Sequence, residues 1–522
     1  MTDPRDSDTT LQMHNEPIER GEKELPMSSV AEQQPPTAGF FRRHKKKLIA
    51  LGTVSILAAI IIPSVVLGTQ VNDFTYDDHS TNPSVNSNNQ TSNNGFDDSV
   101  QVNAETPPLN EHFRYGEDAI RGVNLGGWLV LEPFISPSIF EQFDPSEGVI
   151  DEWTLSEKLG PDEAKRQIQE HYETFITEED FKKIAEMGIN HVRIPTGHWA
   201  VNPIEGEPFV PNLAWDYLLK GIQWARKYGI RVMVELHTAP GSQNGWNHSG
   251  RVGPIGWLNG TKQGYENAQL TIDTVVPMVE FFSRPQWANV VTMFGVINEP
   301  AIYKLDVQRS KQWYLDSYEA IRNVTGEGKG PYLTYHEGFI GLPKWKGFMP
   351  NTTFDRTVLE THTYLIFDQG LVSMSRDSQS EFPCRDWKKD LEQSQKDFGH
   401  TMVGEFSAAT NDCAKYLNGI GLGARYDGTF TDGKPAVCSN CTCNGSEDWQ
   451  NWSDEYKQFL NRFIERQMDA FESGIGWFFW NFKTENHVNP HWDYLLGWEQ
   501  GWIPKYSGNR TYTCAGITEK QE

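Results

Sequence analysis

The fold of this chain is decided by the stretch Val291-Thr-Met-Phe-Gly-Val-Ile-Asn298-Glu299-Pro300. Six of its first seven residues are apolar or β-branched, which predicts a strand that is buried on both faces, as in a parallel sheet. Pro300 cannot donate a hydrogen bond to a neighbouring strand, so the strand must end before it. We therefore expect Asn298 and Glu299 at the carboxyl end of a buried strand, where barrels and open α/β sheets build their active sites.

Strand-like runs alternate with amphipathic, helix-like runs on both sides of this stretch. The eight expected strands are residues 120–124, 190–194, 231–236, 290–297, 332–336, 357–363, 401–405 and 476–481. The helical patterns between them are residues 178–187, 215–228, 310–323, 387–398 and 454–473. This alternation predicts a parallel sheet with crossover helices, and eight units over about 400 residues predict a (β/α)8 TIM barrel with loop insertions. A doubly wound open sheet is the alternative, but it usually has fewer strands.

Polar and aromatic side chains recur where the expected strands end. They are Glu132, Arg193, Glu235, His237, Asn298, Glu299, His336, Glu337, His362, Tyr364, Glu405 and Trp480. A single histidine or glutamate at a strand end is often satisfied by nearby backbone groups. Together, however, these residues place two or more carboxylates, a cation, histidines and aromatic rings around one rim of the barrel.

This set of residues suits the cleavage of a glycosidic bond, which needs one protonated and one ionised carboxyl group. Burial behind an apolar strand is expected to raise the pKa of Glu299 and keep it an acid. Glu405 has Arg193 and His362 as expected neighbours, and these would keep it ionised. Metal-dependent hydrolysis is a weaker alternative because the histidines are dispersed along the chain, so we expect no metal.

Seven longer motifs follow one another in the same region. They are Arg121-Gly-Val-Asn-Leu-Gly-Gly-Trp-Leu-Val-Leu-Glu132-Pro133, His191-Val-Arg193-Ile-Pro195, Leu236-His237-Thr-Ala-Pro-Gly-Ser-Gln-Asn-Gly-Trp246, Asn298-Glu299-Pro300, His362-Thr-Tyr364, Val403-Gly-Glu405-Phe-Ser407 and Trp477-Phe-Phe-Trp480-Asn-Phe-Lys-Thr-Glu485. With these motifs, the region from about residue 110 to residue 516 resembles the fungal exo-β-1,3-glucanases (glucan 1,3-β-glucosidases) of glycoside hydrolase family 5, which are retaining enzymes. The amino-terminal segment before this region lies outside the resemblance and looks like that of the membrane-bound members of the group.

The resemblance implies a catalytic role for two glutamates. Glu299 would be the general acid/base and Glu405 the nucleophile. Arg193, His362 and Tyr364 would orient and tune Glu405. Glucose would be released from the non-reducing ends of β-1,3-glucan by double displacement, in the remodelling of the fungal cell wall. No metal ion or organic cofactor is implied.

The resemblance also implies how sugar is held. Glu132, His237 and Trp480 would bind the glucosyl unit at the non-reducing end, and Asn298 would bond its 2-hydroxyl group. Trp246 and Phe367 would form an aromatic clamp where the next glucose enters. Two alternatives stay open, namely a hydrolase or transglycosylase for another β-glucan, such as a β-1,6-linked one, and a catalytically idle wall-binding protein.

Six cysteines and nine Asn-x-Ser/Thr sequons all follow residue 68, which indicates an oxidising compartment. The sequons are at Asn89, Asn247, Asn259, Asn323, Asn351, Asn440, Asn444, Asn451 and Asn509. The cluster Cys438-Ser-Asn-Cys441-Thr-Cys443 lacks the second paired motif that a zinc finger needs. Residue spacing leaves the disulfide pairing open, whereas the family resemblance implies one bridge from Cys384 to Cys514 and another from Cys413 to a downstream cysteine.

The amino-terminal part of the sequence predicts a membrane anchor. Residues 1–47 read as a disordered cytoplasmic tail that ends in a basic cluster, and residues 48–68 are an uncharged run long enough to span a bilayer. A signal peptide is the competing interpretation, but its apolar core is shorter and lies at the extreme amino terminus. The basic cluster predicts a single-pass type II protein with its catalytic domain outside. Among the membranes of the secretory route, we expect the plasma membrane. Residues 69–106 are expected to be a flexible stalk, and residues 107–522 the hydrolase domain.

Composition limits the partners of the chain. A formal net charge of −24 over 522 residues argues against nucleic acid. Aromatic residues make up 12% of the chain and include 18 tryptophans, which suits either sugar stacking or a large core. We expect a monomer that binds β-1,3-glucan and is anchored in a membrane.

Overall fold

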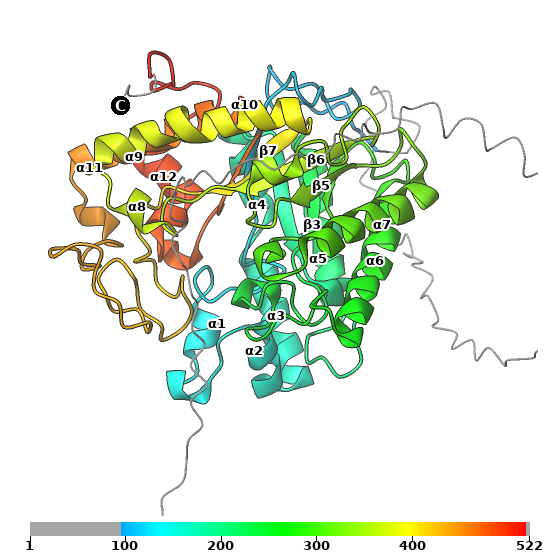
Figure 1. Cartoon of the computed structure of the whole chain (residues 1–522), viewed down its shortest axis with the longest axis horizontal. Helices are drawn as coiled ribbons and strands as arrows, with labels where there is room; N and C mark the ends of the chain where they lie inside the picture. The colour runs from blue at the N-terminus through cyan, green and yellow to red at the C-terminus, as the bar shows by residue number, and fades with distance from the viewer. Residues whose placement is uncertain (1–95, 518–522) are drawn as a thin grey trace, which may run out of the picture. The chain divides into compact units, whose positions relative to one another are not determined.

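Eight parallel strands close into a barrel in a computed structural model that describes residues 96–517 (Figure 1). Each strand pairs with the next one along the chain, and β8 pairs with β1. The strands are β1 (Ile120–Asn124), β2 (His191–Thr196), β3 (Arg231–Leu236), β4 (Val291–Gly295), β5 (Tyr332–His336), β6 (Thr357–His362), β7 (Thr401–Phe406) and β8 (Gly476–Phe479). The predicted (β/α)8 barrel is confirmed, and the doubly wound alternative is excluded.

Strand β4 ends at Gly295, two residues earlier than predicted. Gly295 pairs with Glu235 of β3 and with Thr334 of β5. A β-carbon at position 295 would lie 2.5 Å from Cγ of Glu235, so only glycine allows these two strands to meet here. The close approach brings the buried Glu235 side chain beside the segment that carries Asn298 and Glu299.

Helices lie outside the strands and cover them. The longer ones are α3 (Pro161–Thr174), α4 (Glu178–Glu186), α5 (Leu213–Lys227), α6 (Lys262–Phe282), α7 (Val307–Thr325), α10 (Lys388–Asp397) and α11 (Asp454–Phe471). The shorter ones are α1 (Ser138–Glu141), α2 (Glu152–Leu159), α8 (Gln369–Val372), α9 (Arg376–Phe382) and α12 (Tyr494–Gln500). Helices α6 and α7 pack side by side along one side of the barrel (Figure 1).

Apolar residues fill the barrel interior toward the amino ends of its strands. A separate buried cluster there contains Ile120, Met233, Met293, Val358, Met402 and Phe478. A much larger apolar core lies between the strands and the surrounding helices. His191 is a buried polar exception at this end, but Arg193 and the buried carboxylates lie toward the carboxyl ends of the strands, where the predicted site lies.

Residues 96–106 differ from the predicted flexible stalk. The side chain of Asp98 is buried and forms an ion pair with Arg226 of α5 at 2.9 Å. The Arg226 guanidinium also lies 4.1 Å from the ring centre of Phe96. These contacts fix the segment to the outside of the barrel, so the ordered domain begins before the predicted boundary at residue 107. The expected tail, membrane span and remaining stalk lie outside the described residues.

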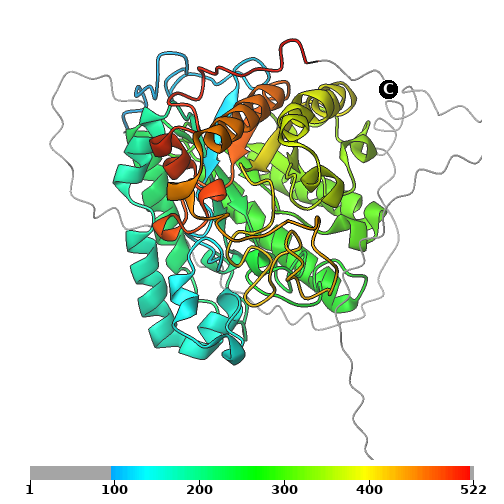
Figure 2. The same cartoon turned by 90° about the vertical axis from the view of Figure 1, so that its left-hand side faces the viewer.

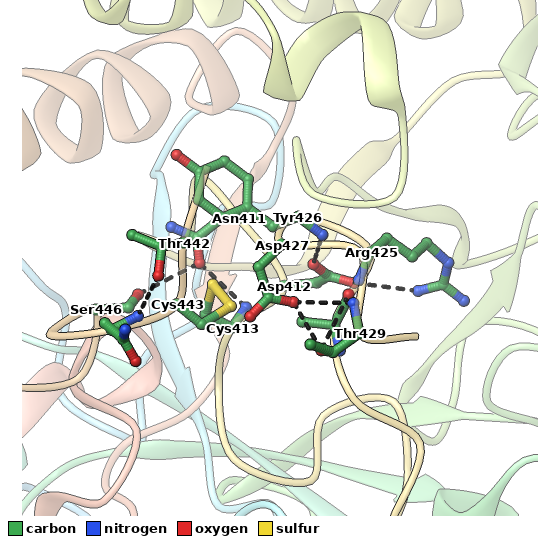
Figure 3. Close-up of a disulfide and its surroundings, with 12 residues drawn as sticks. Asn411, Asp412, Cys413, Arg425, Tyr426, Asp427, Thr429, Thr442, Cys443 and Ser446 are labelled. Atoms are coloured by element: carbon green, nitrogen blue, oxygen red, sulfur yellow. Dashed lines mark hydrogen bonds and ion pairs between the residues drawn. A yellow bond between two sulfur atoms is a disulfide. The ribbon is translucent and has the colours of Figure 1, made fainter. Parts of the chain in front are cut away.

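The segment between β7 and α11, residues 407–453, consists of loops apart from one short turn at Trp449–Asn451 (Figure 2). The disulfide Cys413–Cys443 joins the two halves of this segment (Figure 3). Beside it, the buried Asp412 carboxylate accepts hydrogen bonds from the backbone N–H groups of Arg425 and Tyr426, both at 2.9 Å. The cross-link and this carboxylate hold together a segment that has no sheet or long helix of its own.

Both disulfides implied by the resemblance are confirmed. Cys384 pairs with Cys514, and Cys413 pairs with Cys443. The third bridge joins Cys438 to Cys441. None of the cysteines is free. Within residues 96–517, no helix combines the length and the apolar character that crossing a membrane requires.

Candidate active site

Arg193 of β2 occupies the centre of the barrel's carboxyl end and is fully buried. Its guanidinium donates hydrogen bonds to Glu405 at 3.0 Å and to Asn298 at 2.8 Å. It also forms ion pairs with Glu360 at 3.1 Å and with Glu235 at 3.6 Å. One cation therefore joins side chains from four neighbouring parts of the rim, and it balances part of their negative charge.

Glu299 and Glu405 approach each other through His362, at the end of β6. Nδ1 of His362 lies 2.6 Å from Oε1 of Glu299 and 3.4 Å from Oε2 of Glu405. Because both distances share one atom, these two carboxylate oxygens lie no more than about 6 Å apart. A separation of this size is compatible with the retaining class, in which the two carboxyl groups lie about 5–5.5 Å apart.

The pKa directions predicted for these two glutamates are wrong. Burial alone would raise the pKa of Glu299, but the hydrogen bond and positive charge of His362 outweigh it and hold this pKa well below its usual range. Burial raises the pKa of Glu405 to about 7; the charge of Glu299 adds to this rise, while His362, Arg193 and the Tyr364 hydroxyl oppose it. The sequence could not show that His362 would lie closer to Glu299 than to Glu405.

His362 also bears on whether the site could hold a metal ion. Glu299, His336 and His362 each place one potential ligand atom within 4.8 Å of the others. Both ring nitrogens of His362, however, lie against carboxylates, Nδ1 at Glu299 and Nε2 at Glu360, 3.2 Å away. Burial lowers the pKa of His362, but these glutamates and Glu405 raise it to about 10. A protonated imidazole has no lone pair for a metal, so this group does not fit one.

Two further carboxylates belong to the site: Glu235 was expected at a strand end without an assigned role, and Glu360 was not predicted. Glu360 lies two residues before His362 in β6, and its Oε2 accepts a hydrogen bond from Thr334 at 2.8 Å. Glu235 lies two residues before His237, and its Oε2 lies 2.9 Å from Nδ1 of His237. Residues two apart in a strand face the same side of the sheet. This two-residue spacing could have indicated that Glu235 and Glu360 belong to the site, because His237 and His362 are predicted to face the inside of the barrel.

Three of the predicted sugar-binding residues line the same region. His237 and Trp480 stack with their ring centres 5.6 Å apart and nearly parallel. Glu132 is buried, and its Oε1 has no hydrogen-bond partner among the described residues. Burial and the charges of Glu405 and Glu299 raise the pKa of Glu132 well above its usual value. A buried carboxyl oxygen without a partner is suited to bind a hydroxyl group of a ligand.

The predicted aromatic residues lie on two different loops. Trp246 follows β3, and its ring centre lies 5.6 Å from that of Phe339, a residue that the sequence analysis did not single out. Phe367 follows β6 and is 54% exposed, with its ring centre 5.8 Å from that of Tyr364. The hydroxyl of Tyr364 donates to Oε2 of Glu405 at 2.9 Å. The aromatic surface thus continues directly from the carboxylates toward solvent.

Glu299 has an unusual backbone conformation, with φ at +43°. Few residues other than glycine adopt this region, so the surroundings must impose it. Two amide side chains of the loop after β3 do so, because Gln243 donates to the carbonyl of Asn298 at 2.9 Å and Asn244 donates to that of Glu299 at 3.2 Å. Both belong to the motif that ends at Trp246, and the sequence alone gave no role for them.

We predict that Arg193→Met lowers the free energy of unfolding by about 3–5 kcal/mol, because it leaves buried carboxylates without their cation. Arg193 helps to lower the pKa of Glu360 to about 2, against the effect of burial. Without Arg193, burial should raise the pKa of Glu360 above the value that it has in the unfolded chain. A carboxyl group with a raised pKa stabilises the fold only at low pH. The loss of unfolding free energy in Arg193→Met should therefore be larger at pH 7 than at pH 5.

Urea unfolding at both pH values measures this effect. Arg166→Met is the matched control, since Arg166 pairs with Glu163 on the surface and an exposed pair contributes roughly 0–1 kcal/mol. Equal losses for the two variants would contradict the central role of Arg193.

A buried carboxylate pair at the carboxyl end of a (β/α)8 barrel is the arrangement found in barrel glycosidases. The family model described as "Cellulase (glycosyl hydrolase family 5)" matches residues 160–422. The chain therefore belongs to glycosyl hydrolase family 5.

Several fungal relatives match over most of the chain. The "Probable glucan 1,3-beta-glucosidase D" of Aspergillus terreus is 44% identical over 434 residues, which cover 81% of this chain and 51% of the relative. The "Glucan 1,3-beta-glucosidase D" of Emericella nidulans is 43% identical over 432 residues, with the same coverage of both chains. The chain thus spans about half the length of these relatives.

A solved structure shares the fold at lower sequence identity. The rutinosidase from Aspergillus niger aligns with a TM-score of 0.56 and 20% identity, over 76% of this chain and 100% of its own. This likeness concerns the fold alone.

Proposed function

We propose that this chain is a retaining exo-β-1,3-glucanase that releases glucose from the non-reducing ends of β-1,3-glucan in fungal cell-wall remodelling. The observation that carries the proposal is the carboxylate pair Glu299 and Glu405, whose oxygens lie within about 6 Å of each other around His362. The linkage is supported by the relatives, which are named as glucan 1,3-β-glucosidases.

In the first chemical step, Glu405 attacks the anomeric carbon while Glu299 gives a proton to the departing glycosidic oxygen. The bond from the anomeric carbon to that oxygen breaks, and an ester to Glu405 forms. In the second step, Glu299 takes a proton from water, and the water oxygen displaces Glu405. Arg193 and Tyr364 both bond Glu405, so they hold the nucleophile in position.

His362 supplies the route by which the proton reaches Glu299. In the free site the pKa of Glu299 is lowered, and that of Glu405 is about 7. The acid therefore has to gain a proton while the nucleophile loses one. Because Nδ1 of His362 contacts both carboxylates, it can give its proton to Glu299 and take the proton of Glu405. No charge is created in this exchange, which is favourable in a buried site.

The residues around the pair would hold the sugar. Glu132, with its unpartnered oxygen, and the stacked His237 and Trp480 would bind the terminal glucosyl unit. Asn298, fixed by Arg193, would bond the 2-hydroxyl group. Trp246 and Phe367 would stack on the next glucose, since apolar sugar faces pack well on aromatic rings.

We further propose the predicted localisation: residues 48–68 anchor the chain in the plasma membrane as a single-pass type II protein, with the hydrolase domain outside. The three disulfides of the described residues fit an oxidising compartment. We also propose that the domain acts as a monomer.

A product time course tests the proposed substrate and mode of cleavage. The purified protein is incubated with laminarin, a β-1,3-glucan, and in parallel with a β-1,6-glucan. Glucose as the only early product from laminarin is the expected result. A ladder of oligosaccharides would contradict exo action, and release from the β-1,6-glucan alone would favour the other linkage. No release from either would favour the wall-binding alternative.

A further inference from the structure

A second histidine lies against Glu299, and the catalytic steps described above do not use it. His248 belongs to the turn Asn247–Ser249 in the loop after β3. Its Nε2 lies 3.3 Å from Oε2 of Glu299, while His362 contacts the other oxygen, Oε1. Each oxygen of this carboxylate therefore has an imidazole of its own.

The two imidazoles are held in different ways. His362 ends a barrel strand, and carboxylates bond both of its ring nitrogens. His248 lies in a loop, and its buried Nδ1 has no hydrogen-bond partner among the described residues. Because Nε2 faces the ionised Glu299 carboxylate, a neutral His248 carries its hydrogen on Nε2.

The surroundings of His248 keep it neutral. Burial lowers its pKa to about 4; the charge of Glu299 opposes this fall, and His237 and His362 add to it. The charge of Glu235 also opposes this fall in the pKa of His248. The rings of His237 and Trp246 flank it, with centres 5.6 Å and 5.4 Å away.

We propose that His248 is a positioning residue for the acid/base Glu299. A neutral imidazole with its hydrogen on Nε2 donates to the Glu299 carboxylate. When His362 protonates Glu299 on Oε1, Oε2 carries no hydrogen and still accepts this hydrogen bond. His248 therefore keeps Oε2 in place both before and after proton transfer, whereas His362 gives its hydrogen to Oε1 in that transfer. This inference rests on the role proposed for Glu299.

The test compares His248→Leu, which has neither donor nor acceptor, with His248→Gln and His248→Asn, whose amides have both. With laminarin, the leucine variant should lose kcat about 10-fold or more while KM changes little, because the acid is misplaced. In the substrate complex Glu405 is ionised and Glu299 carries the proton. Loss of the donor destabilises ionised Glu299, so the alkaline limb of the pH profile of kcat should move up by about one unit. At least one of the two amide variants should restore both kcat and the position of the alkaline limb.

Two controls separate positioning from a loss of fold. Val252→Ala, an exposed change in the same loop, should leave all values unchanged. If His248→Leu lowers the thermal midpoint of unfolding, the comparison is made with His248→Phe instead, because phenylalanine keeps a ring without nitrogens. The leaving group of a dinitrophenyl glucoside departs without an acid. The initial burst rate of the variant on this substrate should therefore stay within a few-fold of the wild-type rate.

The proposal is overturned if His248→Leu keeps the laminarin kcat and the alkaline limb, or if neither amide variant restores them. This failure differs from that of the proposed function. If Glu299→Gln leaves laminarin turnover unchanged, the acid itself is misassigned. If Glu299→Gln removes turnover and His248→Leu does not, only the role of His248 is wrong.

Discussion

Replacement of Glu405 by alanine is expected to reduce laminarin turnover by at least about 10⁴-fold, because no other group can form the covalent intermediate. Glu405 accepts a hydrogen bond from Tyr364 and bonds Arg193. Both partners remain in the variant, so the fold of the rim should be kept and the loss should be chemical. The measurement is kcat on laminarin together with the thermal midpoint.

Azide provides a positive control for this variant. A small anion can enter the space left by the Glu405 side chain and attack the anomeric carbon of an activated aryl β-glucoside from the same face. The carbon is then inverted once, so the product should be α-glucosyl azide. Wild-type activity in Glu405→Ala, or rescue that gives only the β-azide, would contradict the assignment of Glu405 as the nucleophile.

Replacement of Glu299 by glutamine is expected to reduce laminarin turnover by about 10²–10⁴-fold, the usual contribution of a general acid. The amide matches the carboxyl group in shape but cannot give up a proton to a sugar oxygen. The initial cleavage of a dinitrophenyl glucoside should be much less affected, because that leaving group departs without protonation. Steady-state and burst kinetics on the two substrates measure the difference.

Equal losses on both substrates would contradict the acid role, since they would indicate a general defect in binding or folding. In Glu299→Ala, azide should instead attack the glycosyl-enzyme intermediate on Glu405 and give β-glucosyl azide. The two variants are therefore expected to give azides of opposite configuration, and the same azide from both would contradict the paired roles.

Most of the fold could be predicted because each strand has a local signature. Three of the eight strands, β1, β3 and β5, have the predicted ends. Helix α6 escaped prediction; it contains Pro277, a residue that normally interrupts a helix. Residues 96–106 were misjudged as a stalk because a polar composition does not reveal one buried ion pair, Asp98 with Arg226.

The residues of the site were easier to predict than their protonation. Polar residues at strand ends pointed to Arg193, His362 and the two glutamates that we propose as catalytic, since the barrel brings those ends together. A pKa changes when the distance between side chains from different strands changes by a few tenths of an ångström. His362 lies 2.6 Å from Glu299 and 3.4 Å from Glu405, and this difference reverses the predicted directions.

The anomeric configuration of the first glucose released from laminarin tests the central claim most directly. Proton NMR can follow it within minutes, before mutarotation mixes the two anomers. Double displacement through Glu405 predicts β-glucose as the first product. If α-glucose appears first, the reaction inverts the anomeric carbon in a single displacement, and the account of Glu299 and Glu405 as a retaining pair is contradicted.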